Sequence, residues 1–163
     1  MIGEKPMQKI TPFLWFEGNA EEAMKFYVSI FKKSKVLMVR RYGDAGPGPK
    51  GSVMTASFQI EGQTFYALNG GPHFKFSPAI SFFVDCKTQK EVDDLYAKLS
   101  KGGSKQPCGW LQDKFGVSWQ IIPSILGELL GDKDPVKANK AMAAMLKMQK
   151  LDIAKLKKAA GKK

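Results

Sequence analysis

The sequence predicts an α+β protein in which two paired βαβββ modules form a cupped mixed sheet, with helices at the C-terminal end. A pattern of strand, helix and three strands occurs twice, over about residues 8–70 and 78–123. Glycine-containing turns separate neighbouring strands in each repeat. We therefore expect residues 1–132 to hold both modules and residues 133–163 to form a lysine-rich helical extension.

The first module begins with a predicted apolar strand at residues 9–16, in which Pro12 indicates a strand start or an edge position. Asn19 is a favourable N-cap for the next segment, whose apolar residues recur at helical spacing. Residues 36–42 are the second predicted strand.

A loop rich in glycine and proline, residues 43–49, follows that strand. It leads to a predicted hairpin with strands at residues 53–60 and 63–68. The turn between them contains Glu61 and Gly62, which favour a tight connection.

The second module repeats this order, although few residues are identical between the halves. Residues 79–85 are its first predicted strand. Thr88 is a favourable N-cap, and Glu91 stands three residues later, which is the spacing of a capping box. The Gly102–Gly103 pair is typical of a helix end.

The second module closes with a predicted hairpin whose last strand has two different faces. Residues 105–111, which Pro107 can divide into two short strands, precede a turn from Asp113 to Gly116. In residues 117–122 bulky apolar side chains alternate with a hydroxyl and an amide. Such a strand packs against a helix on one face and lines a cavity on the other.

The C-terminal part is predicted to be helical and to pack against the rest of the protein. Residues 124–130 are a short helix, and Asp134 followed by Pro135 is a typical helix start. A further apolar face suits docking on the same domain or on a second subunit of a homodimer. It comprises Met142, Met145, Leu146, Met148, Leu151, Ile153 and Leu156.

The net charge of +11 resides mainly in this extension. Residues 133–163 contain ten lysines and two aspartates, whereas residues 1–132 carry a net charge of only +3. Lysine-rich helices usually present a solvated face, and the extension has no aromatic residue on which a base could stack. Nucleic-acid binding through this tail is therefore a distant alternative.

The chain has the features of a cytoplasmic protein. Two cysteines, Cys86 and Cys108, are too few for a disulfide framework, which favours a reducing compartment. Residues 1–9 have no apolar segment typical of a secretory signal. No apolar run approaches the roughly 18 residues of a membrane span, so we expect no membrane partner.

Several segments together resemble the vicinal oxygen chelate superfamily, which includes glyoxalase I, extradiol dioxygenases and bleomycin-resistance proteins. The sequence is most similar to the PhnB-like group, labelled 3-demethylubiquinone-9 3-methyltransferase. The segments that carry the resemblance are Ile10–Phe16, Ala20–Ala23 with Phe26–Tyr27, Cys108–Gln120 and, in the tail, Met145–Leu156.

This resemblance implies four metal-ligand positions on four strands, where metal-dependent members carry His or Glu. Here they correspond to Pro12, about Ala67, Ala79 and Gln120. Proline and alanine offer no ligand atom, and a glutamine oxygen is a weak neutral donor. The single histidine, His73, lies in a turn apart from these positions. We therefore expect no metal centre of the usual kind and no cofactor.

The methyltransferase label finds no support in the sequence. An S-adenosylmethionine enzyme typically binds its cofactor at a glycine-rich turn between a strand and a helix. The glycine-rich loop at residues 43–51 is predicted to join two strands, so it has no helix N-terminus to offer.

The expected ligand is a small organic molecule bound in a sheet-lined cavity. The alternative is an enzyme of the same superfamily that works without the usual metal, or with a weakly held one. In that case Gln120, Ser118, Ser81 and Asn69 would orient the substrate, and the catalytic residues stay unknown. The candidate cavity residues are Leu14, Phe16, Asn69, Ala79, Ser81, Phe83, Trp110, Ser118 and Gln120, with Ile122 on the same strand face.

Other reactive or aromatic residues are better explained by structure. Cys108 suits a small packed thiol, and the Glu21–Glu22 pair suits the first turn of a helix. Asp113 is expected to be a turn residue. Trp15 and Trp119 fall on the predicted helix-facing side of their strands, which favours a core position.

Overall fold

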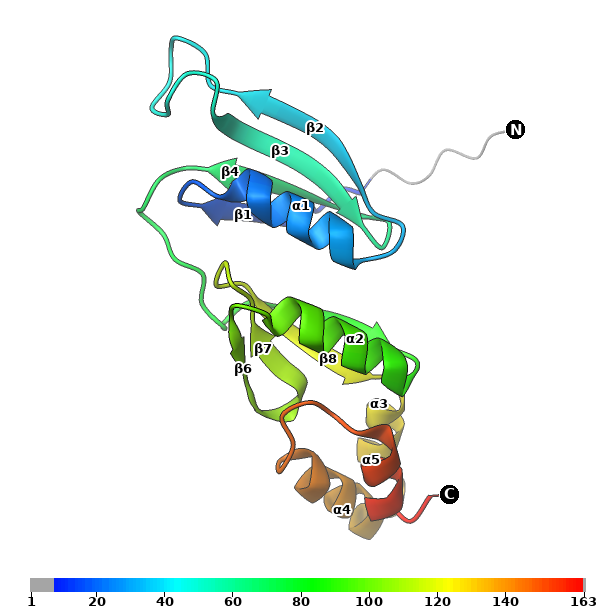
Figure 1. Cartoon of the computed structure of the whole chain (residues 1–163). Coiled ribbons are helices and arrows are strands. Elements are labelled where there is room, and N and C mark those ends of the chain that lie inside the picture. The colour runs from blue at the N-terminus through cyan, green and yellow to red at the C-terminus, as the bar shows by residue number, and fades with distance from the viewer. Residues whose placement is uncertain (1–7, 163) are drawn as a thin grey trace, which may run out of the picture. The chain divides into compact units, whose positions relative to one another are not determined.

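The computed structural model describes residues 8–162, which form two compact units that divide after Lys75. Each unit has a four-stranded mixed sheet with one helix along it (Figure 1). This confirms the α+β fold of two βαβββ modules followed by C-terminal helices. No helix within residues 8–162 is both long enough and apolar enough to cross a bilayer.

In the first unit the strand order is β1-β4-β3-β2, with β1 parallel to β4 and the other neighbours antiparallel. Its elements are β1 (Phe13–Phe16), α1 (Ala20–Ile30), β2 (Lys35–Arg41), β3 (Val53–Ile60) and β4 (Gln63–Asn69). The hairpin between β3 and β4 lies where the sequence predicts it, since Glu61 and Gly62 both have positive φ.

The core of the first unit lies between α1 and one face of the sheet. The ring of Tyr27 on α1 stacks over Phe58 of β3, and Phe58 stacks on its strand partner Phe65. Two residues beyond Phe65 on the same face, Ala67 pairs with Leu14 of β1. Leu14, and Phe16 two residues later, therefore face α1 and are buried.

This register corrects the prediction for β1. Leu14 and Phe16 are core residues and not cavity residues, and Trp15 lies on the opposite face from α1. The indole nitrogen of Trp15 donates a hydrogen bond to the carbonyl oxygen of Gly71 at 2.9 Å. Which side chains of a strand face the helix depends on the register with the neighbouring strand. The four residues of β1 alone do not contain that information.

In the second unit the strand order is β5-β8-β7-β6, with β5 parallel to β8. Its elements are β5 (Ser81–Cys86), α2 (Gln89–Ser100), β6 (Ser104–Lys105), a short 3₁₀ turn η1 (Pro107–Gly109), β7 (Trp110–Gln112) and β8 (Ser118–Pro123). The predicted strand at residues 105–111 is thus interrupted at Pro107, where its ring favours the turn.

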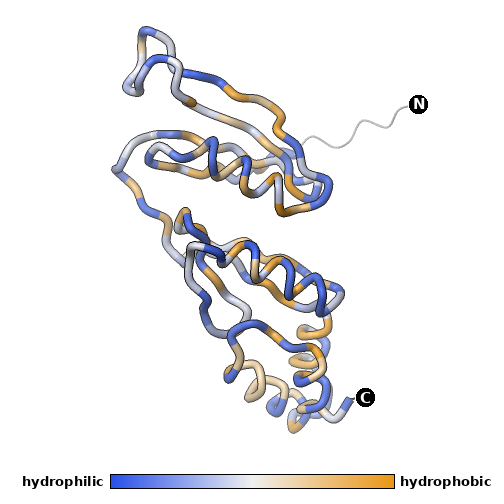
Figure 2. The backbone as a smooth tube through the Cα atoms, viewed as in Figure 1, coloured by the Kyte–Doolittle hydropathy of each residue, from blue (hydrophilic) through white to orange (hydrophobic). Residues whose placement is uncertain are grey.

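Helix α2 starts and packs as its sequence predicts. The hydroxyl of Thr88 accepts a hydrogen bond from the backbone N–H of Glu91 at 3.2 Å, and the Glu91 carboxylate accepts one from the N–H of Lys87. Hydrophilic and hydrophobic residues alternate along α1 and α2 (Figure 2), so each helix has one face for the core. The fully buried residues under α2 are Val92, Tyr96, Leu99, Leu111, Trp119 and Ile121.

The C-terminal helices are α3 (Ile125–Leu130), α4 (Pro135–Met145) and α5 (Ile153–Ala159), and they belong to the second unit. They form a core with β8 that contains Ile122, Leu126, Leu129, Ala141, Leu151, Leu156 and Ala160. Met145 and Met148 pack against this core, as expected for the apolar face of the tail. Met142 on α4 and Leu146, the residue that follows this helix, do not, because both side chains are exposed.

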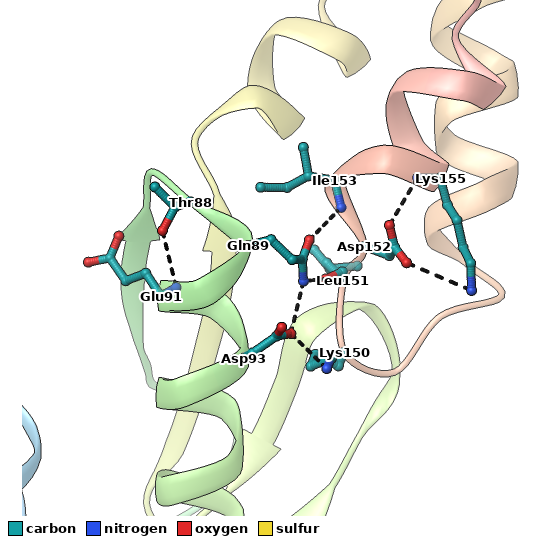
Figure 3. A network of polar contacts seen from close by, with 9 residues as sticks. All are labelled: Thr88, Gln89, Glu91, Asp93, Lys150, Leu151, Asp152, Ile153 and Lys155. Atoms are coloured by element: carbon teal, nitrogen blue, oxygen red, sulfur yellow. Dashed lines mark hydrogen bonds and ion pairs between the residues drawn. The ribbon is translucent and has the colours of Figure 1, made fainter. Parts of the chain in front are cut away.

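Polar contacts hold the segment before α5 against α2. The Gln89 side chain donates to the carbonyl oxygen of Leu151 and to Asp93, and it accepts from the N–H of Ile153 (Figure 3). Asp93 also pairs with Lys150 at 2.7 Å. The hydrogen bonds from Lys150 and Gln89 hold the pKa of the Asp93 carboxyl below its usual value.

Candidate functional site

The face of the second sheet opposite α2 brings together most of the predicted site residues. In the strand register Ser81 pairs with Ser118, and Gln120 pairs with both Phe83 and Trp110. Paired residues point to the same side of a sheet, and Trp119 and Ile121 occupy the side covered by α2. We call this set of residues the Gln120 face; it comprises Ser81, Phe83, Trp110, Gln112, Ser118 and Gln120.

The polar centre of the Gln120 face consists of neutral groups. The side-chain nitrogen of Gln120 donates a hydrogen bond to the hydroxyl of Ser81 at 2.9 Å. Ser118 is only 1% exposed, and its hydroxyl oxygen has no hydrogen-bond partner within residues 8–162. Such a group costs about 1–3 kcal/mol if nothing satisfies it.

Aromatic side chains flank this centre. Phe83 is 61% exposed although it stands in the middle of β5, and Trp110 is half-buried on β7. At the end of the face, Ile122 is buried in the core made by the C-terminal helices. The face therefore offers apolar surface beside neutral donors and acceptors, an arrangement that orients a ligand without transferring a proton.

The remaining predicted site residues lie elsewhere. Leu14 and Phe16 are in the core of the first unit, and Ala79 precedes β5 in an exposed turn. Asn69 is structural: its side-chain oxygen accepts from the N–H of Ala20 at 2.9 Å, and its nitrogen donates to the carbonyl of Val53 at 3.0 Å. Asn69 thereby takes over the capping of α1.

The sequence did not reveal Gln112, which lies beside Ser118 on β7. Its side chain donates to the carbonyl oxygen of Gly116 at 3.0 Å. On the first sheet, Phe13 and Tyr66 are paired neighbours on the face opposite α1, with ring centroids 5.8 Å apart. Phe13 lies on the same face of β1 as Trp15, which was expected from the sequence to face the helix. A correct assignment of the two faces of β1 would therefore have identified Phe13 and its partner Tyr66.

The first unit also contains a pocket of about 360 Å³ at the carboxyl ends of the parallel strands β1 and β4. The loop before β3 closes one side of it, where Gly46 and Gly48 pack against the ring of Tyr42 so closely that a Cβ atom would collide. The Tyr42 hydroxyl donates to the carbonyl oxygen of Asn69 at 2.8 Å.

The structure supports the structural interpretation of the reactive side chains. The Asp113 carboxylate accepts hydrogen bonds from the N–H groups of Phe115 and Val117 and from the indole of Trp119, and it is buried. The thiol of Cys108 points at the carbonyl oxygen of Met145. Burial raises the pKa of the Cys86 thiol to about 12, and Glu91 and Asp85 add to this effect.

The donor atoms of the Gln120 face do not fit a divalent metal of the usual kind. Its oxygen donors are the neutral side chains of Ser81, Gln112, Ser118 and Gln120, whereas transition metals favour imidazole, thiolate or carboxylate. Within residues 8–162 no three His, Cys, Asp or Glu side chains gather into a possible metal site.

Comparisons with solved structures agree with this architecture. A PhnB protein from Bacillus cereus is 42% identical, covers 71% of this chain and 99% of its own, and has a TM-score of 0.67. A Pseudomonas aeruginosa protein is 24% identical over 71% of this chain and 97% of its own, with a TM-score of 0.60. Comparison with curated proteins finds no match.

A more distant structure shares the fold alone. It is a mutant of a fosfomycin-resistance protein from Listeria monocytogenes, in complex with Mn(II) and 1S,2S-dihydroxypropylphosphonic acid. It is 10% identical, covers 71% of this chain and 90% of its own, and has a TM-score of 0.50.

Two βαβββ units, each with a helix on one face of a mixed sheet, define a protein of the vicinal oxygen chelate superfamily. Within it, the chain belongs to the 3-demethylubiquinone-9 3-methyltransferase family, whose model matches residues 8–122. The matched residues end before α3, so the tail segment of the resemblance lies outside the family match.

Proposed function

We propose that this protein binds a small, neutral organic molecule on the Gln120 face. The observation that carries the proposal is the buried hydroxyl of Ser118, which has no partner within residues 8–162 and stands next to the Gln120–Ser81 pair. Buried polar groups are nearly always satisfied, so a ligand atom is a natural partner.

The chemistry of the neighbours narrows the ligand class. The oxygen and nitrogen atoms of the face are neutral, which suits a hydroxyl or carbonyl group better than a charged one. Phe83 and Trp110 provide apolar surface on which a flat ring can lie. We therefore infer an aromatic or strongly apolar body that carries a hydroxyl or carbonyl group.

The family description names a methyltransferase, but the geometry gives that activity no specific support. The glycine-rich loop connects β2 to β3, which are antiparallel neighbours, so no helix N-terminus faces it. The alternative of an enzyme without the usual metal lacks a candidate acid or base on the Gln120 face. Binding is therefore the function we propose.

The test has two parts. Native mass spectrometry of protein purified without denaturation should show whether a small molecule is retained. Elemental analysis of the same protein should find well under one equivalent of Zn, Ni, Fe or Mn. NMR titration with phenol, acetophenone and benzamide should shift the side-chain signals of Gln120 and Trp110. Stoichiometric metal, or shifts confined to the pocket by Tyr42, would overturn the proposal.

We also propose that the protein is a homodimer that leaves this face accessible. Sedimentation velocity gives the oligomeric state directly. A monomer would contradict the dimer while leaving the ligand proposal standing.

A further inference from the structure

A groove of about 580 Å³ lies between α4 and α5, beyond residues 8–122 that the family model matches. Its floor is small and apolar, and its rim is basic. We call its apolar lining residues, Ala143, Ala144, Met148 and Ala159, the floor, and its basic lining residues, Lys140, Lys147 and Lys155, the rim.

The C-terminal segment has too few acidic residues to balance the positive charge around the groove. Residues 133–163 have ten lysines and two aspartates, and both aspartates cap helices. Asp134 accepts from the N–H of Val136, and Asp152 accepts from the N–H of Lys155. Lys155 lies 3.8 Å from Asp152, whereas Lys140 and Lys147 form no ion pair within residues 8–162.

Two large apolar side chains of the same segment remain in solvent. Val136 is 59% exposed and Leu146 is 61% exposed. Val136, Lys140 and Ala143 follow one another at helical spacing, so apolar and basic groups share one side of α4. A partner that supplies both apolar area and negative charge would complement such a surface.

We propose that this groove binds an acidic amphipathic helix of a partner protein. Lys140 lies on α4 and Lys147 just beyond its end, and this spacing of seven residues suits carboxylates placed about two turns apart on the partner. The alanine floor lets a helix approach closely, and apolar residues between the carboxylates would cover the alanines and Val136.

Three other anionic partners fit less well. The groove is open to solvent, so a single acyl chain would keep much of its apolar surface in water. A bilayer is flat where this surface is concave, and residues 133–163 lack the aromatic residues that anchor proteins at a membrane interface. Nucleic acid would use the lysines but gain nothing from the apolar floor.

The test uses the full chain and a fluorescein-labelled helical peptide of about 15 residues, with glutamates seven apart and leucine and alanine between them. Fluorescence anisotropy at about 0.15 M salt should show saturable binding. The same peptide with glutamine in place of glutamate should bind about tenfold more weakly or less. No saturable binding of the glutamate peptide overturns the proposal.

Four substitutions distinguish binding in the groove from a general effect of positive charge. Lys140→Glu and Lys147→Glu should each weaken binding about tenfold, whereas Lys133→Glu makes the same charge change outside the groove and should weaken it less than about twofold. Ala143→Leu fills the floor without changing the charge and should also weaken binding about tenfold. Thermal unfolding of each variant reports whether it still folds.

Equal losses for Lys133→Glu and Lys140→Glu would overturn the proposal, as would an Ala143→Leu variant that folds and binds normally. Phosphatidylglycerol vesicles and a duplex DNA of mixed sequence serve as competitors. If either binds more tightly than the peptide, with the same dependence on Lys140 and Lys147, the groove belongs to that partner and the proposal fails. None of these outcomes bears on ligand binding at the Gln120 face.

Discussion

The side-chain nitrogen of Gln120 lies 2.9 Å from the hydroxyl oxygen of Ser81, and this contact joins β8 to β5 across the Gln120 face. It fixes the orientation of the carboxamide, because its nitrogen is committed to Ser81. The amide oxygen accepts no hydrogen bond from any donor within residues 8–162, so it remains available to a ligand.

Replacing Gln120 by leucine should weaken fragment binding with little effect on the fold. We expect the affinity for acetophenone or phenol to fall about tenfold, because one hydrogen bond between uncharged groups is lost. The free energy of unfolding should change by less than about 1 kcal/mol, since Gln120 is only partly buried. NMR titration and urea unfolding measure the two effects. Gln63→Leu, at an exposed position of β4, is the matched control and should change neither.

Ser118→Ala should increase stability and decrease ligand binding. The hydroxyl is buried without a partner within residues 8–162, so its removal relieves a desolvation cost of about 1 kcal/mol. If the Ser118 hydroxyl forms a hydrogen bond with the ligand, the same substitution lowers the affinity for the fragments. Differential scanning calorimetry would detect the higher Tm. A lower Tm with unchanged affinity would show that Ser118 is an ordinary structural serine.

Asn69 and Asn19 should differ sharply in their contribution to stability. Asn69→Ala leaves the N–H of Ala20 and the carbonyl of Val53 without their partner, and it should cost about 2 kcal/mol. Asn19 precedes α1, but its side chain makes no capping bond, so Asn19→Ala should be nearly neutral. Urea unfolding of both variants tests this contrast, and equal costs would contradict the observed capping.

Two leucines of the C-terminal segment provide a test of its packing. Leu151 is fully buried in the core of α3, α4 and α5, and Leu151→Ala should cost about 2–5 kcal/mol. Leu146→Ala, at a position that is 61% exposed, should cost less than about 0.5 kcal/mol. Thermal unfolding distinguishes the two. If neither variant loses stability, the segment does not pack as described.

The Cys86 thiol should resist alkylation until the protein unfolds. Its pKa is raised to about 12 in the folded protein, against about 8.5 for a free thiol. Iodoacetamide at about pH 9 should therefore modify Cys86 only in denaturant, as peptide mass spectrometry can show. Because the unfolded thiol ionises first, Cys86 should also reduce stability as the pH rises from about 9 towards 12. Cys86→Ala removes this component, and an unchanged pH profile in that variant would refute it.

Local sequence signals were sufficient to predict the elements of the fold. Thr88 and Glu91 predict the start of α2, and Asp134 with Pro135 predicts the start of α4. The alternation from Val117 to Ile122 predicts which residues of β8 face α2, because a helix beside the strand requires large apolar side chains. Each of these signals involves residues that are close together in the chain, so the sequence alone is enough to recognise it.

The tertiary structure decided how these elements meet. The sequence assigned Leu14 and Phe16 to a cavity, but their pairing with β4 turns them towards α1. It assigned the cap of α1 to Asn19, but Asn69, 49 residues from Ala20, supplies the bond. Ser118 is alone in the strand pattern and becomes a buried, unsatisfied hydroxyl only when β5 and β7 lie on either side of it. Each of these relations depends on how segments far apart in the sequence meet in the fold. Strand pairing sets that arrangement, and the local periodicity of one strand does not contain it.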